Sequence, residues 1–340
     1  MIRTLVVGHG FSAQTFHIPF LLASESFEWL GSVSSKPDVI QKKHPLVKVY
    51  DAIDAIPSGE YDLAIVTTPN HLHFEQVKQL LEMDLHVVVE KPMVLNHCHA
   101  TLLFDIAKTE QKVLSVFQNR RWDGDFLTVK SLLQNGTLGS LGRFVSRFDR
   151  FRPAVRERWR ESAIDGAGIL WDLGPHLLDQ MVALFGRPLS ITANVSKLRT
   201  GAKSDDVFEI WCQYPSHEVI LGSSCFQAGP NMRFSVEGTV GSYIKHGLDV
   251  QENALKAGES VLGEQWGAEH DSQWGQLYQE SSQSGVKTVP GNYGEFWMQL
   301  ASAIQSGGAN PVPHEDVLTV IELIEKAHLS SEQRKTITLN

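Results

Sequence analysis

One short segment of the chain combines a histidine with two carboxylates at helical spacing. His176 follows Asp172 by four residues, and Asp179 follows His176 by three. That spacing puts all three side chains on one face of a helix. A histidine beside a carboxylate can take a proton from a hydroxyl group while hydride leaves the same carbon, and Asp172 can orient the imidazole. The alternative is a structural histidine at a helix start, with Asp172 as the cap and with Pro175 bending or restarting the helix.

A lysine offers a further reactive group. Glu90, Lys91 and Pro92 directly follow an apolar segment that we expect to be a buried strand. At such a strand end Lys91 can donate a hydrogen bond to a substrate oxygen. The alternative is a lysine that only pairs with Glu90. The residue types thus make Lys91, Asp172 and His176 the candidates for proton transfer and for holding a reacting oxygen.

The start of the chain carries a glycine pattern that predicts a nucleotide site. Gly8, Gly10 and Ala13 fit G-x-G-x-x-G/A. The first glycine makes the turn, the second lets the backbone approach a pyrophosphate, and the small third residue lets the helix pack close to the strand. Free N–H groups at the helix start face the phosphate, so Phe11 and Ser12 join the expected cofactor contacts. An unliganded glycine turn is the alternative.

The end of the second expected strand indicates which dinucleotide is bound. An acidic residue there would bind the ribose 2′-hydroxyl of NAD and repel the 2′-phosphate of NADP. This chain has Ser34, Ser35 and Lys36 instead, and Asp38 comes only after a proline. We therefore expect NADP as the preferred cofactor. If Lys36 is an ordinary loop lysine, NAD is accepted as well.

Two further loops are expected beside the cofactor and the substrate. Asn70 is a natural helix N-cap, so a structural role is the alternative to contact with the ribose or nicotinamide. Asn119 and Arg121 follow the sixth expected strand and could line a substrate pocket. The cofactor contacts expected after the fourth and fifth strands are Thr67, Thr68, Pro69, Asn70, His73, Glu90 and Lys91.

The elements that must position these residues alternate between strand and helix in the first third of the chain. Nearly continuous apolar strands separated by helices predict a doubly wound parallel sheet, an α/β Rossmann domain over residues 1–120. Ligands bind at the carboxyl ends of such strands, which is where every motif above lies. A helix is expected over Asn96–Lys108. The expected strands are Leu5–Val7, Phe27–Ser34, Val47–Tyr50, Leu63–Thr68, His86–Val89 and Val113–Phe117.

The remainder, residues 121–340, reads as an α+β domain. Val207–Tyr214 and Met232–Val236 alternate apolar and polar residues, which predicts an open, largely antiparallel sheet. Ala254–Gly291 is polar and is expected to be a long excursion. The last quarter returns to helical spacing, and these helices could pack back on the first domain. We assign this second domain to substrate binding and oligomerisation.

Together the motifs resemble the Gfo/Idh/MocA oxidoreductase family. The glycine turn, Thr-Pro-Asn-x-x-His, Glu-Lys-Pro and Asp-x-Gly-x-His-x-x-Asp occur in the family's order. Tracts around Gln118–Asp123, Phe148–Pro153 and Asp172–Gln180 are similar to its bacterial branch of NADP-dependent scyllo-inositol dehydrogenases. The likeness runs essentially from Ile2 to Leu339. Pro175, at a variable position, and Ala13, in place of a third glycine, depart from the family's commonest residues.

The resemblance implies roles for individual residues. It makes His176 the acid/base, has Lys91 position the reacting hydroxyl, lets Asp179 touch substrate hydroxyls and allows a cis bond between Lys91 and Pro92. It also implies an outer sheet face that builds a homodimer or homotetramer. Glycosidases that retain NAD share this scaffold, so such an enzyme is one alternative. A non-catalytic NAD(P)-binding sensor is the other.

Two clusters remain open to interpretation. Arg150 and Arg152 could face the substrate pocket and would suit an acidic substrate, although surface ion pairs are the commoner role of such residues. His97, Cys98 and His99 lack a second pair of ligands and start a helix, so we expect no metal site.

Composition restricts the class of protein. The chain has 340 residues, of which 42% are hydrophobic, enough for two cores, and its net charge of −9 leaves no basic excess for nucleic acid or anionic membrane. Three widely spaced cysteines form no disulfide framework, and we recognise neither a signal peptide nor a membrane-spanning stretch. We expect a cytoplasmic enzyme that interconverts a secondary alcohol and a ketone of a polyol, inositol or sugar.

Overall fold

The computed structural model describes residues 1–339, which form two compact units. Unit 1 consists of Met1–Asn119, Gln251–Trp266 and Tyr293–Leu318. Unit 2 consists, among the described residues, of Arg120–Val250, Gly267–Asn292 and residues 319–339. Unit 1 therefore includes two stretches of chain that follow most of unit 2 in the sequence. Among residues 1–339, no helix has the length and apolar character needed to cross a lipid bilayer.

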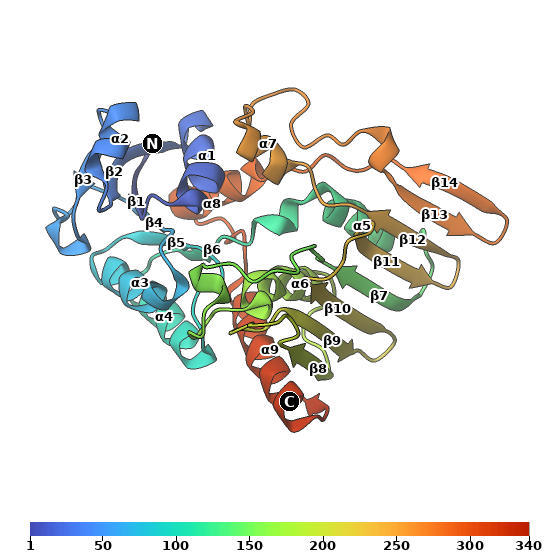
Figure 1. The fold of residues 1–340 in the computed structure, drawn as a ribbon. Coiled ribbons are helices and arrows are strands. Elements are labelled where there is room, and N and C mark those ends of the chain that lie inside the picture. Colours follow the sequence, from blue (N-terminus) through green and yellow to red (C-terminus); the bar gives the residue numbers. More distant parts are fainter. Residues whose placement is uncertain (340) are drawn as a thin grey trace. The chain divides into compact units, whose positions relative to one another are not determined.

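Unit 1 is built on a six-stranded parallel sheet with the order β3-β2-β1-β4-β5-β6 (Figure 1). Its central strands are buried along nearly their whole length, as expected for a sheet covered on both faces. The predicted doubly wound sheet is confirmed, and no strand end differs from its expected position by more than three residues. The strands are β1 Ile2–Val7, β2 Phe27–Val33, β3 Lys48–Tyr50, β4 Leu63–Val66, β5 His86–Val89 and β6 Leu114–Val116.

The helix after β1 is not regular. It contains a π-helical turn, Ala13–His17, before α1 continues over Ile18–Ala23. Asn70 was expected as a helix N-cap, but the N-cap of the 3₁₀ turn Asn70–Leu72 is Pro69 and that of the following helix is Leu72. The other helices of this unit are α2 Pro37–Lys43, α3 His73–Glu82, α4 His97–Thr109, α7 Gln251–Ala257 and α8 Gly294–Ser306.

Unit 2 contains a nine-stranded mixed sheet, β14-β13-β12-β11-β7-β10-β9-β8-β15 (Figure 1). Only β7 and β10 pair in parallel, so the predicted open, largely antiparallel sheet is confirmed. The strands are β7 Leu141–Arg147, β8 Ser190–Ser196, β9 Val207–Gln213, β10 Glu218–Ser224, β11 Met232–Gly238, β12 Gly241–His246, β13 Gly275–Gln279, β14 Ser282–Val286 and β15 Ile337–Thr338.

The sheet of unit 2 has one buried face. On β9, Phe208, Ile210 and Cys212 are fully buried, whereas Trp211 is 49% exposed. Helix α6, Ile169–Phe185, packs on β9 and β10, and α5, Gly124–Gln134, belongs to the same unit. Helix α9, His314–Gln333, begins in the last segment of unit 1 and continues into unit 2.

The polar stretch Ala254–Gly291, expected as a long excursion, contains regular secondary structure. It contains the end of α7 and the hairpin of β13 and β14, which extends the sheet beyond β12. The residues of β14 are exposed or half-exposed and include Ser282, Gln283 and Ser284. An edge strand without a buried face shows no apolar alternation, so the pattern that revealed β9 was absent here.

Candidate active site

The turn after β1 has the geometry of a phosphate-binding glycine turn. Gly8 has φ of +92°, and a Cβ there would lie 2.8 Å from Thr67 Oγ1, so both the backbone and the space require glycine. Its N–H donates to Val33 O at 2.9 Å, which ties the turn to the end of β2. A Cβ on Gly10 would meet nothing within 4 Å. The turn thus leaves open space beside Gly10, where a dinucleotide pyrophosphate approaches the backbone in this motif.

The helix that follows this turn contacts the end of β5. Ala13 is fully buried, in line with the need for a small residue at the helix–sheet contact. Ser12 Oγ donates to the Glu90 carboxylate, and His17 Nε2 lies 2.8 Å from Glu90 Oε1. A π-turn brings residues five apart together, which accounts for the shared contact of Ser12 and His17. Phe11 is 61% exposed at the start of this helix.

Glu90 is a largely buried carboxylate, with its side chain 14% exposed, and it is held by contacts within unit 1. Burial acts to raise its pKa, but the hydrogen bond and charge of His17 and the hydrogen bond of Ser12 lower the pKa to about 2. The backbone N–H of Lys91 lies 3.2 Å from Glu90 Oε2. The glycine motif at the start of the chain does not include His17. In the sequence, the five-residue spacing between Ser12 and His17 was the one local feature related to their shared contact with Glu90.

His73 joins the two predicted cofactor loops. It is 1% exposed, and its Nε2 lies 2.8 Å from Thr68 O while its Nδ1 lies 3.0 Å from Pro92 O. Burial, the largest influence, lowers the pKa of His73. The imidazole therefore bridges the loop after β4 and the turn that carries Lys91. The Lys91–Pro92 peptide bond is cis, as the family resemblance implies.

The residues expected to distinguish NADP from NAD lie at the end of β2. Ser34 N–H donates to Tyr50 O at 3.0 Å, and Lys36 N–H lies 3.1 Å from Ser34 Oγ. Ser35 and Lys36 are exposed. Asp38 lies in the first turn of α2, after Pro37. The side chains next to the strand end are therefore hydroxyls and one cation.

In unit 2, α6 carries the histidine and both aspartates. It begins at Ile169 and runs through Pro175 without interruption, so the proline neither ends nor restarts it. Gly168 has φ of +102° and a Cβ there would lie 2.0 Å from Asp205 Oδ1. The Leu170 N–H donates to Asp205 Oδ2 at 2.7 Å. A carboxylate 35 residues away along the chain therefore caps this helix.

Asp172 lies between two arginines. Its carboxylate oxygens are 3.6 Å from Arg150 Nη1 and 3.4 Å from Arg160 Nε. His176 follows one turn later and is 6% exposed. The sequence identified Arg150 as a residue that could face the substrate pocket, but it offered no signal for Arg160, which lies in the 3₁₀ turn Trp159–Glu161.

Two predicted substrate residues contact each other. Arg121 Nε and Nη2 donate to the two carboxylate oxygens of Asp179 at 2.9 and 2.7 Å. The side chain of Asp179 is 2% exposed and that of Arg121 is 11% exposed. This bidentate pair fixes the segment after β6 to α6. Asn119, the third predicted substrate residue, is 6% exposed at the end of unit 1.

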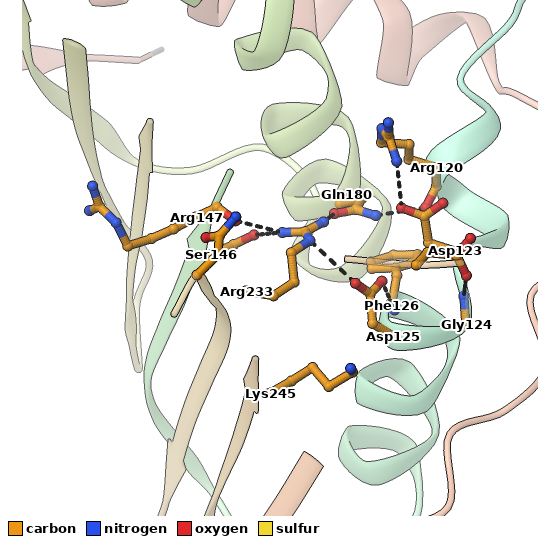
Figure 2. Close-up of polar contacts among 12 residues, drawn as sticks. Arg120, Asp123, Gly124, Asp125, Phe126, Ser146, Arg147, Gln180, Arg233 and Lys245 are labelled. Atoms are coloured by element: carbon orange, nitrogen blue, oxygen red, sulfur yellow. Dashed lines mark hydrogen bonds and ion pairs between the residues drawn. The ribbon is translucent and has the colours of Figure 1, made fainter. Parts of the chain in front are cut away.

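A buried arginine supports the same helix from the sheet side. Arg233 on β11 is fully buried; its Nη1 donates to Ser146 Oγ at 2.6 Å, its Nη2 donates to Gln180 Oε1, and its Nε lies 3.4 Å from Asp125 Oδ2 (Figure 2). Gln180 also donates to Arg120 O at 2.6 Å. We call Arg233 with Asp125, Ser146 and Gln180 the Arg233 cluster. Gln180 is the residue after Asp179, so the cluster holds the turn of α6 that follows His176.

Comparisons with known proteins agree with this architecture. Residues 2–118 match the model of the oxidoreductase family's NAD-binding Rossmann fold, and residues 130–339 match that of the C-terminal alpha/beta domain of the Gfo/Idh/MocA oxidoreductases. The chain is 41% identical to the oxidoreductase YdgJ of Escherichia coli, with 99% of each chain covered. It is 34% identical to the NADP-dependent scyllo-inositol 2-dehydrogenase IolW of Bacillus subtilis, over 99% of this chain and 96% of the relative.

Solved structures give the same result. The oxidoreductase YvaA of Bacillus subtilis superposes with a TM-score of 0.96 at 34% identity, covering 100% of this chain and 98% of that one. The oxidoreductase YPO2259 of Yersinia pestis superposes with a TM-score of 0.94 at 37% identity, covering 100% and 97%.

Proposed function

Because the chain belongs to the Gfo/Idh/MocA oxidoreductase family, we propose that it is an NADP(H)-dependent dehydrogenase that interconverts a secondary alcohol and a ketone of a polyol, inositol or sugar. The observation that carries the proposal is the face of α6 on which Asp172 and His176 lie one helical turn apart. A histidine held near a carboxylate on a rigid helix is suited to proton transfer at a hydroxyl group.

Several residues of unit 1 fit a dinucleotide. The open space at Gly10 and the positive φ of Gly8 suit a pyrophosphate at the helix start. Phe11, Ser12 and Ala13 open that helix, and the loop of Thr67, Thr68, Pro69 and Asn70 continues along the same edge of the sheet. Bound NADP⁺ would supply the hydride acceptor that the protein side chains lack.

The proposed proton chemistry belongs to unit 2. His176 takes the hydroxyl proton of the substrate on its imidazole as the alcohol is oxidised, and returns it in the reverse direction. Asp172 orients His176, and Arg150 and Arg160 hold Asp172 in place. In unit 1, Lys91 donates a hydrogen bond to the reacting oxygen. Its backbone is held by the contacts of Glu90 and of His73 with the Lys91–Pro92 turn.

The relatives' names support this substrate class. IolW is a scyllo-inositol 2-dehydrogenase that uses NADP⁺, and a more distant relative, 25% identical over 67% of this chain, is a D-glucoside 3-dehydrogenase of Escherichia coli. Both names describe oxidation of a ring hydroxyl.

The experiment that tests the proposal follows reduced nicotinamide by absorbance across a panel of polyols and sugars that includes scyllo- and myo-inositol, with NADP⁺ and NAD⁺ in parallel. We expect turnover with NADP⁺. His176→Ala should reduce kcat by about a hundredfold to ten-thousandfold, the usual contribution of a general acid–base. His246→Ala, at an exposed end of β12, is the matched control and should remain active.

Two results would contradict the proposal. Full activity of His176→Ala would remove its acid–base role. Tight cofactor binding with no reduced nicotinamide from any substrate would favour a glycosidase that retains its cofactor or a non-catalytic sensor.

The preference for NADP is tested separately at Ser34, Ser35 and Lys36. Lys36→Gln should raise the KM for NADP⁺ about tenfold, the equivalent of ~1.4 kcal/mol of lost phosphate contact. The KM for NAD⁺ should not change. Lys42→Gln, an exposed lysine on α2, is the control; equal KM values for NADP⁺ in wild type and Lys36→Gln would refute the assignment.

We also propose that the chain self-associates as a homodimer or homotetramer. Support comes from the open nine-stranded sheet, on which Trp211 of β9 is half-exposed. Light scattering coupled to size exclusion gives the mass in solution, and a monomer at micromolar concentration would contradict this proposal.

A further inference from the structure

Unit 2 contains a pocket that is unusually rich in arginine. It lies beside the N-terminus of α6, whose first residue Ile169 and preceding Gly168 form part of its wall. The space in the pocket and its open mouth, solvent at the opening included, is about 310 Å³. We call it the Arg152 pocket. Its arginines are Arg150, Arg152, Arg158, Arg160 and Arg199.

Each carboxylate that lines this pocket already has an ion-pair or hydrogen-bond partner within the protein. Asp172 lies within 3.6 Å of both Arg150 and Arg160. Glu161 pairs with Arg158 at 2.7 Å and with Arg199 at 3.0 Å. Asp205 accepts the Leu170 N–H at the start of α6. The three carboxyl groups that line the pocket therefore contact four arginines and a helix end, and Arg199 also pairs with Asp206, outside the pocket lining, at 3.0 Å.

Arg152 is the arginine of the pocket that pairs with none of these carboxylates. Among residues 1–339, its guanidinium has neither an ion-pair nor a hydrogen-bond partner, although its backbone N–H donates to Cys225 O at 2.8 Å. Burial and then the positive charges of Arg150 and Arg158 lower the pKa of Arg152. An arginine in this situation gains from any anion that enters the pocket.

The surplus of positive charge is specific to this place. The chain as a whole has 39 acidic and 30 basic residues, so an arginine excess does not follow from composition. The N-terminus of the 17-residue helix α6 adds a partial positive charge to the same pocket. A planar guanidinium fork suits carboxylate and phosphate groups, which it can bind through two parallel hydrogen bonds.

From this arrangement we infer that the Arg152 pocket binds an anionic group, carboxylate or phosphate, carried by the substrate. That the anion belongs to the substrate rests on the proposed oxidoreductase function. The pocket is linked to the proposed acid/base because Asp172 lines the pocket and precedes His176 by one turn of α6. An anionic substituent would bind at the open mouth of the pocket, beside the arginines, while the ring that carries it lies near His176. The preferred substrates are then sugar acids or sugar phosphates, and neutral sugars bind more weakly.

The test compares three ligands with the same ring: D-glucose, D-glucuronate and D-glucose 6-phosphate. Their dissociation constants are measured by calorimetry on the full chain saturated with NADP⁺. We expect at least one anionic ligand to bind about tenfold or more tightly than glucose, as charge-assisted hydrogen bonds imply. Preference for glucuronate assigns a carboxylate, and preference for glucose 6-phosphate assigns a phosphate.

Arg152→Gln should abolish the preference for the anionic ligand and leave glucose binding unchanged. Arg156→Gln removes the same charge from an exposed side chain outside the pocket, and should keep the preference. Arg152→Lys, which keeps the charge but loses the fork, should give an intermediate value and provides the test if the glutamine variant does not fold. Equal binding of all three ligands to wild type, or an unchanged preference in Arg152→Gln, would overturn the inference.

Formation of NADPH in the same samples separates this inference from the proposed function. If an anion preference depends on Arg152 but no ligand yields NADPH, the anion site stands and the dehydrogenase proposal loses support. If neutral sugars are oxidised and wild type shows no anion preference, the dehydrogenase proposal stands and the anion site is refuted.

Discussion

Unit 2 contains arginines in two settings that differ in charge balance, the Arg233 cluster and the Arg152 pocket. In the Arg233 cluster, one fully buried guanidinium meets a carboxylate, a hydroxyl and an amide oxygen (Figure 2). The Arg152 pocket is lined by five arginines and three carboxylates, one of which caps a helix, and Arg199 also pairs with Asp206 outside the lining. Phe148 lies near both, with its ring centroid 5.8 Å from Arg233 Cζ and 5.3 Å from Arg150 Cζ.

The difference shows how the partners of an arginine indicate whether it stabilises the fold or binds a ligand. A buried arginine whose charge meets an internal carboxylate and whose Nη atoms have internal hydrogen-bond partners joins elements together, here α5, α6, β7 and β11. Removing it leaves polar groups buried without compensation. An arginine that lacks such a partner contributes little to the fold, because its neighbours repel it. Its charge is then available to a ligand, and the three predictions below test this distinction.

The largest effect on stability is expected at Arg233. Arg233→Met should lower the free energy of unfolding by about 3–5 kcal/mol, because Asp125 and Gln180 would remain buried without their partner. Denaturant unfolding followed by circular dichroism measures this loss. Arg143→Gln, on an exposed part of β7, is the control and should unfold close to wild type. If the two variants had equal unfolding midpoints, Arg233 would not hold the sheet to α6.

Glu90 extends the comparison to a compensated charge in unit 1. Its pKa of about 2 lies below the ordinary 4.5, so its ionised form stabilises the folded state by about 3 kcal/mol. This stabilisation is complete above pH 4.5 or so and is lost as the pH falls toward 2. Glu90→Gln should therefore be less stable than wild type at neutral pH, and the gap should close in acid.

Unfolding curves recorded between pH 2 and pH 7 measure the effect of Glu90. Glu28→Gln, an exposed position on β2, should follow the wild-type curve throughout. A constant gap between wild type and Glu90→Gln across this range would mean that His17 and Ser12 do not hold the carboxylate in its ionised form.

The smallest effect on stability is expected at Arg152. Arg152→Gln removes a charge that lies among like charges, so the free energy of unfolding should change by no more than about 0.5 kcal/mol, or rise slightly at low salt. Thermal unfolding at two salt concentrations measures it, beside Arg156→Gln. A loss as large as that of Arg233→Met would show that Arg152 is part of the fold's internal ion pairs.

The sequence predicted unit 1 better than unit 2, for a physical reason. Buried parallel strands and the glycine turn are local patterns, so β5 was predicted with both ends correct and Gly8 was found at its turn. Strand β14 has no buried residue, and on β13 only Gly275 is buried, so this hairpin left no apolar alternation. Asp205 caps α6 from 35 residues away along the chain, and Arg121 pairs with Asp179 across 58 residues. Contacts between residues so far apart in sequence leave no local spacing pattern that could predict them.

The arginines illustrate the same limit within one residue type. The sequence located Arg150 and Arg152 near the expected substrate domain but could not decide between surface ion pairs and a ligand site. That decision depends on which carboxylates reach them. Asp172 and Glu161 are shared by four arginines from three separate segments of chain, which only the folded structure reveals.

The most direct test of the contrast between the two arginine groups is an anomalous difference map from crystals of the full chain soaked in selenate, which mimics an anionic substituent. We predict a selenium peak within hydrogen-bond distance of the Arg152 guanidinium, absent from crystals of Arg152→Gln, and no peak beside Arg233. Selenate bound elsewhere while the Arg152 pocket stays empty would contradict the account, as would an unchanged peak in Arg152→Gln.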